Sequence, residues 1–166
     1  MIGRKSYIGN NLEIAENYFN IAKNDEKVAI ILENQKFYNQ SAYFFIQAME
    51  KYVKHHIATK IDVLNPYFAG EIGKTMGHSL NKSLEVLVKI YSGDNKVLFE
   101  QMNQQIQQHV LKDLNFRFLN SSLRYPVFNP KHKNYTLYSL NRSDCEELKK
   151  ILETLKNYLN NLSRLK

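Results

Sequence analysis

Cysteine, proline and glycine are scarce in this sequence of 166 residues, and tryptophan is absent. The single cysteine, Cys145, excludes a disulfide within the chain and favours a reducing compartment. The longest apolar runs, at 28–32 and 42–46, are too short to span a bilayer, and residues 1–11 lack the apolar core of a signal peptide. We therefore expect a cytoplasmic protein that does not cross a membrane.

Acidic side chains are also in the minority. Lysine and arginine together number 23 against 16 aspartates and glutamates, which gives a formal net charge of +7. A positive field favours polyanionic partners such as RNA, although the same excess of charge also serves solubility. Because 43% of the residues are hydrophobic, the chain can bury a substantial core, and we expect a single domain over residues 1–166.

The segment from 37 to 57 predicts the helix around which the others pack. Its apolar residues recur at helical spacing and form a continuous stripe. They are Ala42, Phe45, Ile46, Met49, Val53 and Ile57. No glycine or proline interrupts the segment, and Glu50 precedes Lys54 by one turn, which is the favourable order for an ion pair.

One helix is expected before this segment and one after it. The first spans residues 11–23, and residues 25–34 either extend it or form a short helix of their own. The other spans residues 78–91 and ends where Gly93 supplies a left-handed cap. Its inward face consists of Leu80, Leu84, Leu87, Val88 and Tyr91.

Two more helices are expected in the second half of the chain. A long one covers residues 96–123. Its inner side consists of Val97, Met102, Ile106, Val110, Leu114, Phe118 and Leu119. The last one runs to about residue 165 and opens with a capping box that pairs Ser143 with Glu146. Since no strand pattern longer than a few residues is present, the predicted fold is all-α, an up-and-down bundle of about five helices.

Two connections interrupt the helices. Residues 62–77 are expected to form a loop, and Gly73, Lys74 and Thr75 within it match the end of a phosphate-binding P-loop. Phe68 replaces the first glycine of that motif and a helix precedes it, which argues against a nucleotide site. Residues 125–142 form a longer connection, which is expected to be functional or to pack back as an ordered lid. Its aromatic anchors would be Tyr125, Phe128, Tyr135 and Tyr138.

Few residues are candidates for chemistry. The five histidines lie at 55, 56, 78, 109 and 132, and no two are three or four residues apart, so no metal site and no cofactor is expected. Cys145 could have a lowered thiol pKa at the start of a helix, but no histidine lies near it in sequence, which favours a structural role.

Basic side chains cluster between residues 109 and 133. This stretch holds five of them, against Asp113 alone. They are Lys112, Arg117, Arg124, Lys131 and Lys133. Arg117 and Arg124 are seven residues apart and so lie on one side of a helix, next to an aromatic connection. Single-stranded RNA requires cations for phosphates and rings for bases, although the arginines could equally pair with carboxylates on neighbouring helices.

Three landmarks together resemble the HEPN domain family. The pattern A-x-x-F-x-Q-A-x-E-K-x-x-K, from Ala42 to Lys54, resembles the second helix of these domains. Residues 77–80 (GHSL) are similar to the start of their third helix, and residues 123–126 (LRYP) to the end of their fourth. The structural signature residues are Gln47, Glu50, Lys51 and His78. The landmarks occur in the right order, and the resemblance covers residues 10–162.

This resemblance implies a homodimeric helical bundle. Many HEPN domains are metal-independent endoribonuclease toxins that pair with a nucleotidyltransferase-type antitoxin, and their site uses an arginine and a histidine from an R-x(4–6)-H motif. In this sequence Arg124 and His132 are separated by seven residues that include Pro126 and Pro130, and Tyr125 replaces the polar residue after the arginine. Arg124 would instead form a buried or interface ion pair, with Glu50 as its candidate partner.

Two hypotheses follow from these departures. The first is a non-catalytic HEPN-like module that dimerises and binds RNA, a nucleotide or a nucleotidyltransferase-type partner. Its expected contacts are Arg117, Arg124, Tyr125, Lys131 and Lys133. The alternative is a divergent ribonuclease toxin that uses Arg124 to steady the phosphate and His132 to transfer protons. The first is preferred, because the motif that defines catalysis is absent.

Overall fold

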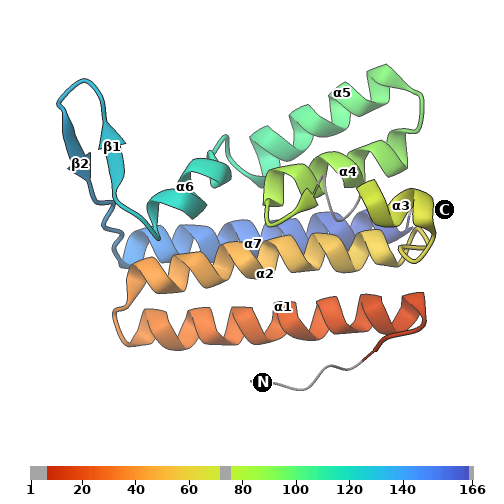
Figure 1. Cartoon of the computed structure of the whole chain (residues 1–166), viewed down its shortest axis with the longest axis horizontal. Helices are drawn as coiled ribbons and strands as arrows, with labels where there is room; N and C mark the ends of the chain where they lie inside the picture. Colours follow the sequence, from red (N-terminus) through yellow and green to blue (C-terminus); the bar gives the residue numbers. More distant parts are fainter. Residues whose placement is uncertain (1–6, 72–75, 165–166) are drawn as a thin grey trace.

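The computed structural model describes residues 7–71 and 76–164 of the chain. Most of these residues are helical, which confirms the predicted all-α class. Three long helices lie side by side: α1 (Asn11–Asn34), α2 (Tyr38–Ala58) and α7 (Arg142–Arg164), with α1 antiparallel to α2 (Figure 1). Among the described helices, none has both the length and the apolar character that crossing a bilayer requires.

Helix α2 is the centre of the fold, as the sequence predicts. It contacts α1, α7, α4 and α6, and its apolar stripe is buried from Ala42 to Ile57. The two predicted segments before it form one continuous helix, α1. Ala15, Ala22 and Ala29 recur every seven residues on α1 and are buried. Because alanine has a small side chain, this stripe lets α1 pack closely against α2.

The connection after α2 is more ordered than a loop. A short helix, α3 (Pro66–Glu71), begins at the proline, which suits the first turn of a helix because it lacks an amide hydrogen. The P-loop-like residues 73–75 lie outside the described part of the chain. Helix α4 (Leu80–Ser92) follows and ends at Gly93, as predicted. Gly93 has a positive φ of +53°, which glycine adopts readily, but its ψ of −127° lies outside the left-handed helical region of the predicted cap.

The prediction of one helix over residues 96–123 is wrong. The segment divides into α5 (Lys96–Gln105), a π-helical turn η2 (Ile106–Val110) and α6 (Phe116–Ser122). Lys112 and Asp113, which lie between η2 and α6, have positive φ values of 52° and 57°. The side chain of Asn115 then accepts a hydrogen bond from the Phe118 amide and starts α6 in a new direction. The predicted core residues Leu114 and Phe118 are exposed at this break, and Val97, in the first turn of α5, is exposed as well.

The connection 125–142 contains a β-hairpin rather than a lid. Strands β1 (Val127–Asn129) and β2 (Asn134–Thr136) pair antiparallel, with Phe128 opposite Tyr135, and the hairpin projects from one end of the molecule (Figure 1). All four predicted aromatic anchors are exposed. The rings of Phe128 and Tyr135 contact each other, and Tyr138 contacts Phe118, so the aromatic residues stabilise the connection locally instead of entering the core.

The capping box of α7 lies two residues earlier than predicted. The side chain of Asn141 accepts hydrogen bonds from the amides of Ser143 (2.8 Å) and Asp144 (3.4 Å), and the Asp144 carboxylate accepts one from the Asn141 amide (2.8 Å). These reciprocal bonds satisfy amides that have no partner within the helix. Glu146, the predicted partner of Ser143, instead pairs with Arg142.

Replacing Asn141 is therefore expected to destabilise the protein. We expect Asn141→Ala to lower the free energy of unfolding by about 1 kcal/mol, because two helix-start amides lose their acceptor. Urea unfolding followed by circular dichroism measures this change. Ser143→Ala is the matched control and should stay within about 0.5 kcal/mol of the parent, as expected for a surface substitution. A larger loss of stability in the Ser143 variant than in the Asn141 variant would instead support the capping box predicted from the sequence, in which Ser143 is the cap.

Candidate phosphate-binding pocket between helices α2, α4 and α6

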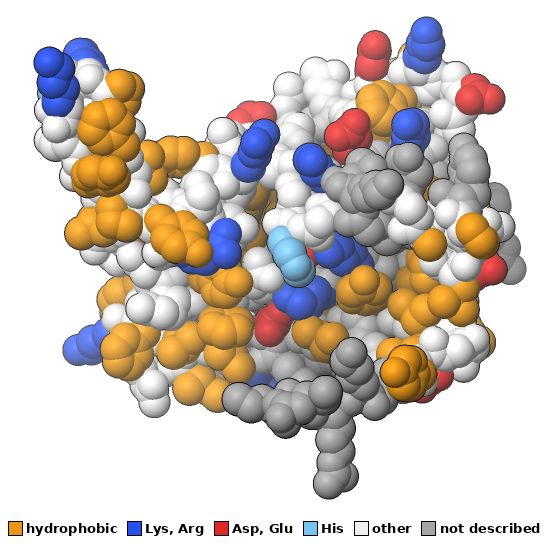
Figure 2. Space-filling model, viewed as in Figure 1, with side chains coloured by type: hydrophobic (Ala, Val, Ile, Leu, Met, Phe, Trp, Pro, Cys, Tyr) orange, Lys and Arg blue, Asp and Glu red, His pale blue; other side chains and the backbone are white. Residues whose placement is uncertain are grey.

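Basic side chains converge on a pocket between α2, α4 and α6. The pocket has a volume of 310 Å³, and its buried floor includes Ile46, Met76 and Phe116. Its polar and charged rim consists of His78, Ser79, Lys82, Arg117, Asn120, Ser121 and Arg124. Figure 2 shows blue lysine and arginine side chains around a pale-blue histidine at the centre of this face. The rim includes no aspartate or glutamate among the described side chains.

Arg124 is held in place by aromatic rings on two elements. Its guanidinium group lies 5.6 Å from the centre of the Tyr43 ring and 5.4 Å from that of Tyr125, and its Nε donates a hydrogen bond to the Asn120 carbonyl. Stacking of this kind leaves the outer nitrogens of the guanidinium available. Arg124 is therefore held in one orientation by these contacts. The predicted ion pair with Glu50 is not what the structure shows, since it is Lys54 and His78 that lie beside Glu50.

Glu50 and Lys54 form a buried ion pair beneath the pocket, as the sequence predicts. Lys54 Nζ donates to Glu50 Oε1 at 2.7 Å and to the Gly77 carbonyl at 2.6 Å. Nδ1 of His78 lies 3.7 Å from the same carboxylate oxygen, while the rest of the imidazole is exposed. The pair thus fixes the segment before α4, and it places His78 at the mouth of the pocket.

The start of α4 also faces the pocket. Ser79 is the N-cap, and its side chain accepts a hydrogen bond from the Lys82 amide at 3.4 Å. The backbone amides at the start of a helix lack partners within it, and the helix dipole gives this end a partial positive charge. With Lys82 one turn into the helix, the N-terminus of α4 adds to the charge of Arg117 and Arg124 on the opposite wall.

The predicted RNA contacts divide into two groups. Arg117 and Arg124 line the pocket, and Tyr125 is 62% exposed beside Arg124. Lys131 and Lys133 lie with His132 in the hairpin turn between β1 and β2, at the end that projects from the molecule (Figure 1). The structure therefore separates Arg124 from His132, and the histidine that shares a pocket with Arg124 is His78.

The remaining signature residues join α1 to α2. Lys51 Nζ lies 2.8 Å from a carboxylate oxygen of Asp25 on α1 and donates to the side chain of Gln47 at 3.1 Å. These contacts anchor the edge helix together with other polar contacts, such as the hydrogen bond from the Tyr52 hydroxyl to Glu26. Gln47 and Lys51 thus have a structural place in the fold rather than one in the pocket.

Cys145 lies in the core rather than in the pocket. Cys145 is buried, and burial raises the pKa of its thiol, which favours the structural role. Within residues 7–71 and 76–164, no group of three or more histidine, cysteine, aspartate or glutamate side chains is arranged to hold a metal ion.

Comparison of the chain with models of known protein families, with curated proteins and with solved structures finds no match. The likeness to HEPN domains therefore rests on the three sequence landmarks. In the structure two of these landmarks, residues 77–80 and 123–126, meet at the pocket, where His78 and Arg124 both lie on the rim.

Proposed function

We propose that this protein is a non-catalytic, HEPN-like helical module that binds RNA through phosphate contacts in the pocket between α2, α4 and α6. The observation that supports this proposal is the convergence of Lys82, Arg117, Arg124 and the α4 N-terminus on one hollow whose described rim carries no carboxylate. Phosphate contacts of this kind supply most of the affinity of proteins for nucleic acids.

The charge of these three side chains is available to a ligand. No described carboxylate forms an ion pair with Lys82, Arg117 or Arg124, whereas the described ion pairs elsewhere use other basic residues. Exposed cations without partners repel one another, and a bound phosphate removes that repulsion. Tyr125 and Tyr43 flank Arg124 and offer faces on which an unpaired base can stack.

Proton-transfer groups are sparse in the pocket, which favours binding over cleavage. Cleavage of RNA without a metal ion uses one group to take the proton of the 2′-hydroxyl and another to protonate the leaving 5′-oxygen. His78 is the only histidine on the rim as described, and His132 lies in the hairpin turn. One imidazole with two arginines suffices to hold a phosphate but lacks the second proton-transfer group.

The same proposal includes a homodimer and a nucleotidyltransferase-type partner, as the resemblance implies. Two features of the surface support an assembly. The hairpin exposes Phe128, Tyr135 and Leu137 to solvent, and an isolated two-stranded hairpin is marginally stable in water. Light scattering with size-exclusion chromatography measures the mass of the particle in solution. A mass of about twice 19.5 kDa supports the dimer, and a monomer at all concentrations contradicts it.

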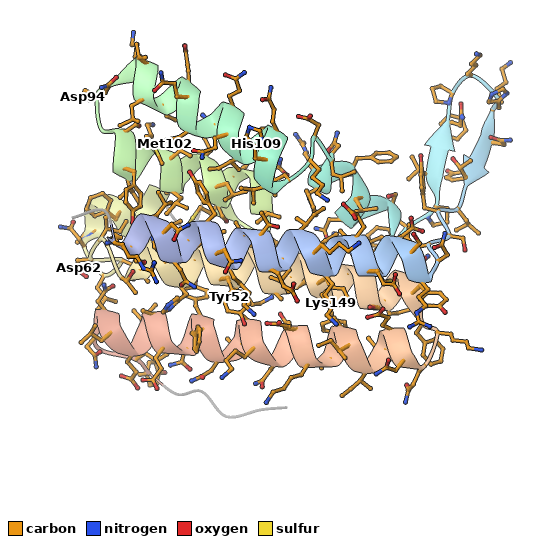
Figure 3. All side chains as sticks on the ribbon, turned by 180° about the vertical axis from the view of Figure 1, so that it is seen from behind. Tyr52, Asp62, Asp94, Met102, His109 and Lys149 are labelled. Atoms are coloured by element: carbon orange, nitrogen blue, oxygen red, sulfur yellow. The ribbon has the colours of Figure 1, made fainter. Side chains whose placement is uncertain are left out.

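Arg124 provides the decisive test of RNA binding. We expect Arg124→Ala to weaken the binding of a short, fluorescein-labelled, single-stranded RNA about tenfold in fluorescence anisotropy, because a fixed phosphate donor is removed. Arg124→Lys should also weaken binding, since an ammonium group cannot donate in the same fork geometry. Lys149→Ala removes one charge from the exposed face of α7 shown in Figure 3 and should leave the affinity unchanged.

If the Arg124 and Lys149 variants lose the same amount of RNA affinity, the effect comes from net charge alone. This result would contradict binding of RNA in the pocket. Absence of binding to any RNA, with the parent protein folded, would redirect the search to a protein partner. The salt dependence provides a further check, because a variant that makes one phosphate contact fewer should show a slope of log affinity against log salt that is smaller by about 1.

A divergent metal-independent ribonuclease is the second candidate, and the presence of Arg124 and His78 on one rim favours it. In this case the parent protein would cleave RNA in the presence of a chelator. Loss of cleavage in Arg124→Ala and His132→Ala would support the pair predicted from sequence, whereas loss in His78→Ala would support the pair that shares the pocket. The preferred proposal predicts no cleavage by the parent protein.

A further inference from the structure

A second hollow lies beside the phosphate pocket, between α4 and α5, which run next to each other in Figure 1. It has a volume of 430 Å³ and shares Ser79, Lys82 and Arg117 with the pocket. Its other walls are Asn81, Glu85, Phe99, Asn103 and Gln107. The two hollows are thus neighbours across a ridge formed by Lys82 and Arg117, one positively charged and the other rich in amides.

We infer that this second hollow holds a nucleobase carrying an exocyclic amino group, and that the phosphate of the same or the adjoining nucleotide lies in the first pocket. The inference rests on the proposed RNA binding and assigns the base that the site selects. Its volume falls within the range of pockets that bind small molecules, and Lys82 and Arg117 stand between the two hollows, where a sugar-phosphate would have to pass.

The walls of the second hollow suit a base rather than a phosphate. The side chain of Glu85 repels a phosphate, while three amide side chains match the donors and acceptors on the edge of a base. Phe99 is partly buried against the core and contributes an aromatic face to the wall. This combination of one ring and several amides is the chemistry by which proteins recognise unstacked bases.

An unsatisfied acceptor indicates which bases fit. Oδ1 of Asn81 is buried and has no hydrogen-bond partner within the described part of the chain. A buried acceptor without a donor is energetically unfavourable, so a rotation of the Asn81 side chain that brings this oxygen to a ligand donor in the hollow is favoured. The Glu85 carboxylate is a second acceptor in the same hollow. Adenine, cytosine and guanine each carry an amino group that can donate to these oxygens, and uracil carries none.

The preference is tested by competition in fluorescence anisotropy. Unlabelled single-stranded RNAs of one length, composed of adenine, cytosine or uracil, compete with a labelled probe for the full-length protein. We expect the adenine and cytosine strands to compete about tenfold better than the uracil strand. A sharper comparison uses adenosine 5′-monophosphate against purine riboside 5′-monophosphate, which lacks only the amino group, and the first should bind more tightly.

Two variants locate the preference in the second hollow. Asn81→Ala and Glu85→Gln should each reduce the discrimination against uracil to about threefold or less while the uracil strand keeps its affinity. Asn81→Ala should not lower the free energy of unfolding, because the oxygen that it removes has no partner in the fold. Arg124→Ala, in contrast, should weaken all strands by the same factor, since it acts on the phosphate.

The outcomes separate this inference from the proposal on which it rests. If the parent binds RNA and loses affinity in Arg124→Ala but shows no preference against uracil, the base site is overturned and the phosphate pocket stands. A preference that persists unchanged in both Asn81→Ala and Glu85→Gln overturns it as well. If no strand binds, the proposed function fails and the base site fails with it.

Discussion

Removing the Glu50 carboxylate is expected to lower the free energy of unfolding by about 3–5 kcal/mol, the largest effect of any single substitution proposed for this protein. Glu50 is 1% exposed and Lys54 is 8% exposed, so their charges have little contact with water. Glu50→Gln leaves the Lys54 ammonium buried without its counter-charge. Lys54→Met likewise leaves the Glu50 carboxylate buried without a counter-charge. Either unpaired charge is strongly unfavourable in a low-dielectric surrounding.

The double variant distinguishes a buried pair from two independent contributions. We expect Glu50→Gln combined with Lys54→Met to be more stable than either single variant, because neither charge is then left without a partner. Part of the destabilisation should remain, since the Gly77 carbonyl also loses its donor. Urea unfolding of the four proteins gives the coupling free energy. If the two single losses simply add in the double variant, the pair does not act as a unit.

An exposed pair with the same spacing provides the control. Arg142 and Glu146 are also four residues apart, with Nε and Oε1 at 3.0 Å, but both side chains are largely exposed. Water screens such a pair, so we expect Arg142→Ala to change the free energy of unfolding by less than about 1 kcal/mol. The difference between the stability losses of the two pairs measures how much burial contributes to an ion pair between residues four apart on a helix.

Helical periodicity predicts α2 and α4 well because each has one face in the core. On α2, Phe45, Met49 and Val53 are fully buried, as the spacing of apolar residues requires. The same criterion fails over residues 96–123, where apolar residues continue at helical spacing through a bend. The information about the bend is carried by Asp113 and Asn115, whose short polar side chains suit positive φ values and helix caps.

The pocket could be predicted only in part. The spacing of Arg117 and Arg124 places them on one side of a helix, and both line the pocket. His78, just before α4, and Lys82, within it, reach the same pocket from positions more than 30 residues earlier in the chain. Their contribution depends on the packing of α4 against α6, which no local pattern records. Ser79, a helix cap three residues before Lys82, is the one local signal of an anion-binding helix start.

The hairpin shows the opposite error, in which closeness in sequence does not give closeness in space. Lys131, His132 and Lys133 follow Arg124 within ten residues, so the sequence groups them into one basic cluster. The pairing of Val127 with Thr136 carries the turn residues away along two strands. Alternation over three residues is too short to distinguish such a strand from a loop, and so the hairpin is not predicted from its sequence.

Acid is expected to destabilise the protein through His56. This side chain is 4% exposed, and burial, together with the nearby charges of Lys60 and His55, lowers its pKa from 6.5 to about 4. Its Nε2 lies 2.7 Å from the Tyr91 hydroxyl of α4, and its Nδ1 lies 3.4 Å from the Ser163 hydroxyl of α7. The folded protein therefore holds His56 neutral at a pH where the unfolded chain binds a proton.

The sign of the effect follows from this difference in proton binding. Above pH 6.5 both states carry a neutral imidazole, and the stability is at its full value. Between pH 6.5 and pH 4 the unfolded state binds more protons, so the free energy of unfolding falls as the pH falls. We expect the parent protein to lose about 2 kcal/mol between pH 7.5 and pH 5 through this residue, as measured by urea unfolding at the two values.

His56→Gln isolates the contribution of the imidazole. Glutamine does not titrate, and its amide can still bond to the Tyr91 hydroxyl, so this variant should be less stable than the parent at pH 7.5 but lose less stability on acidification. A parallel loss of stability in both proteins would assign the acid sensitivity to other groups. A smaller loss in the variant identifies His56 as the group that couples the packing of α2, α4 and α7 to pH, because His56 lies on α2 and its two hydrogen-bond partners lie on α4 and α7.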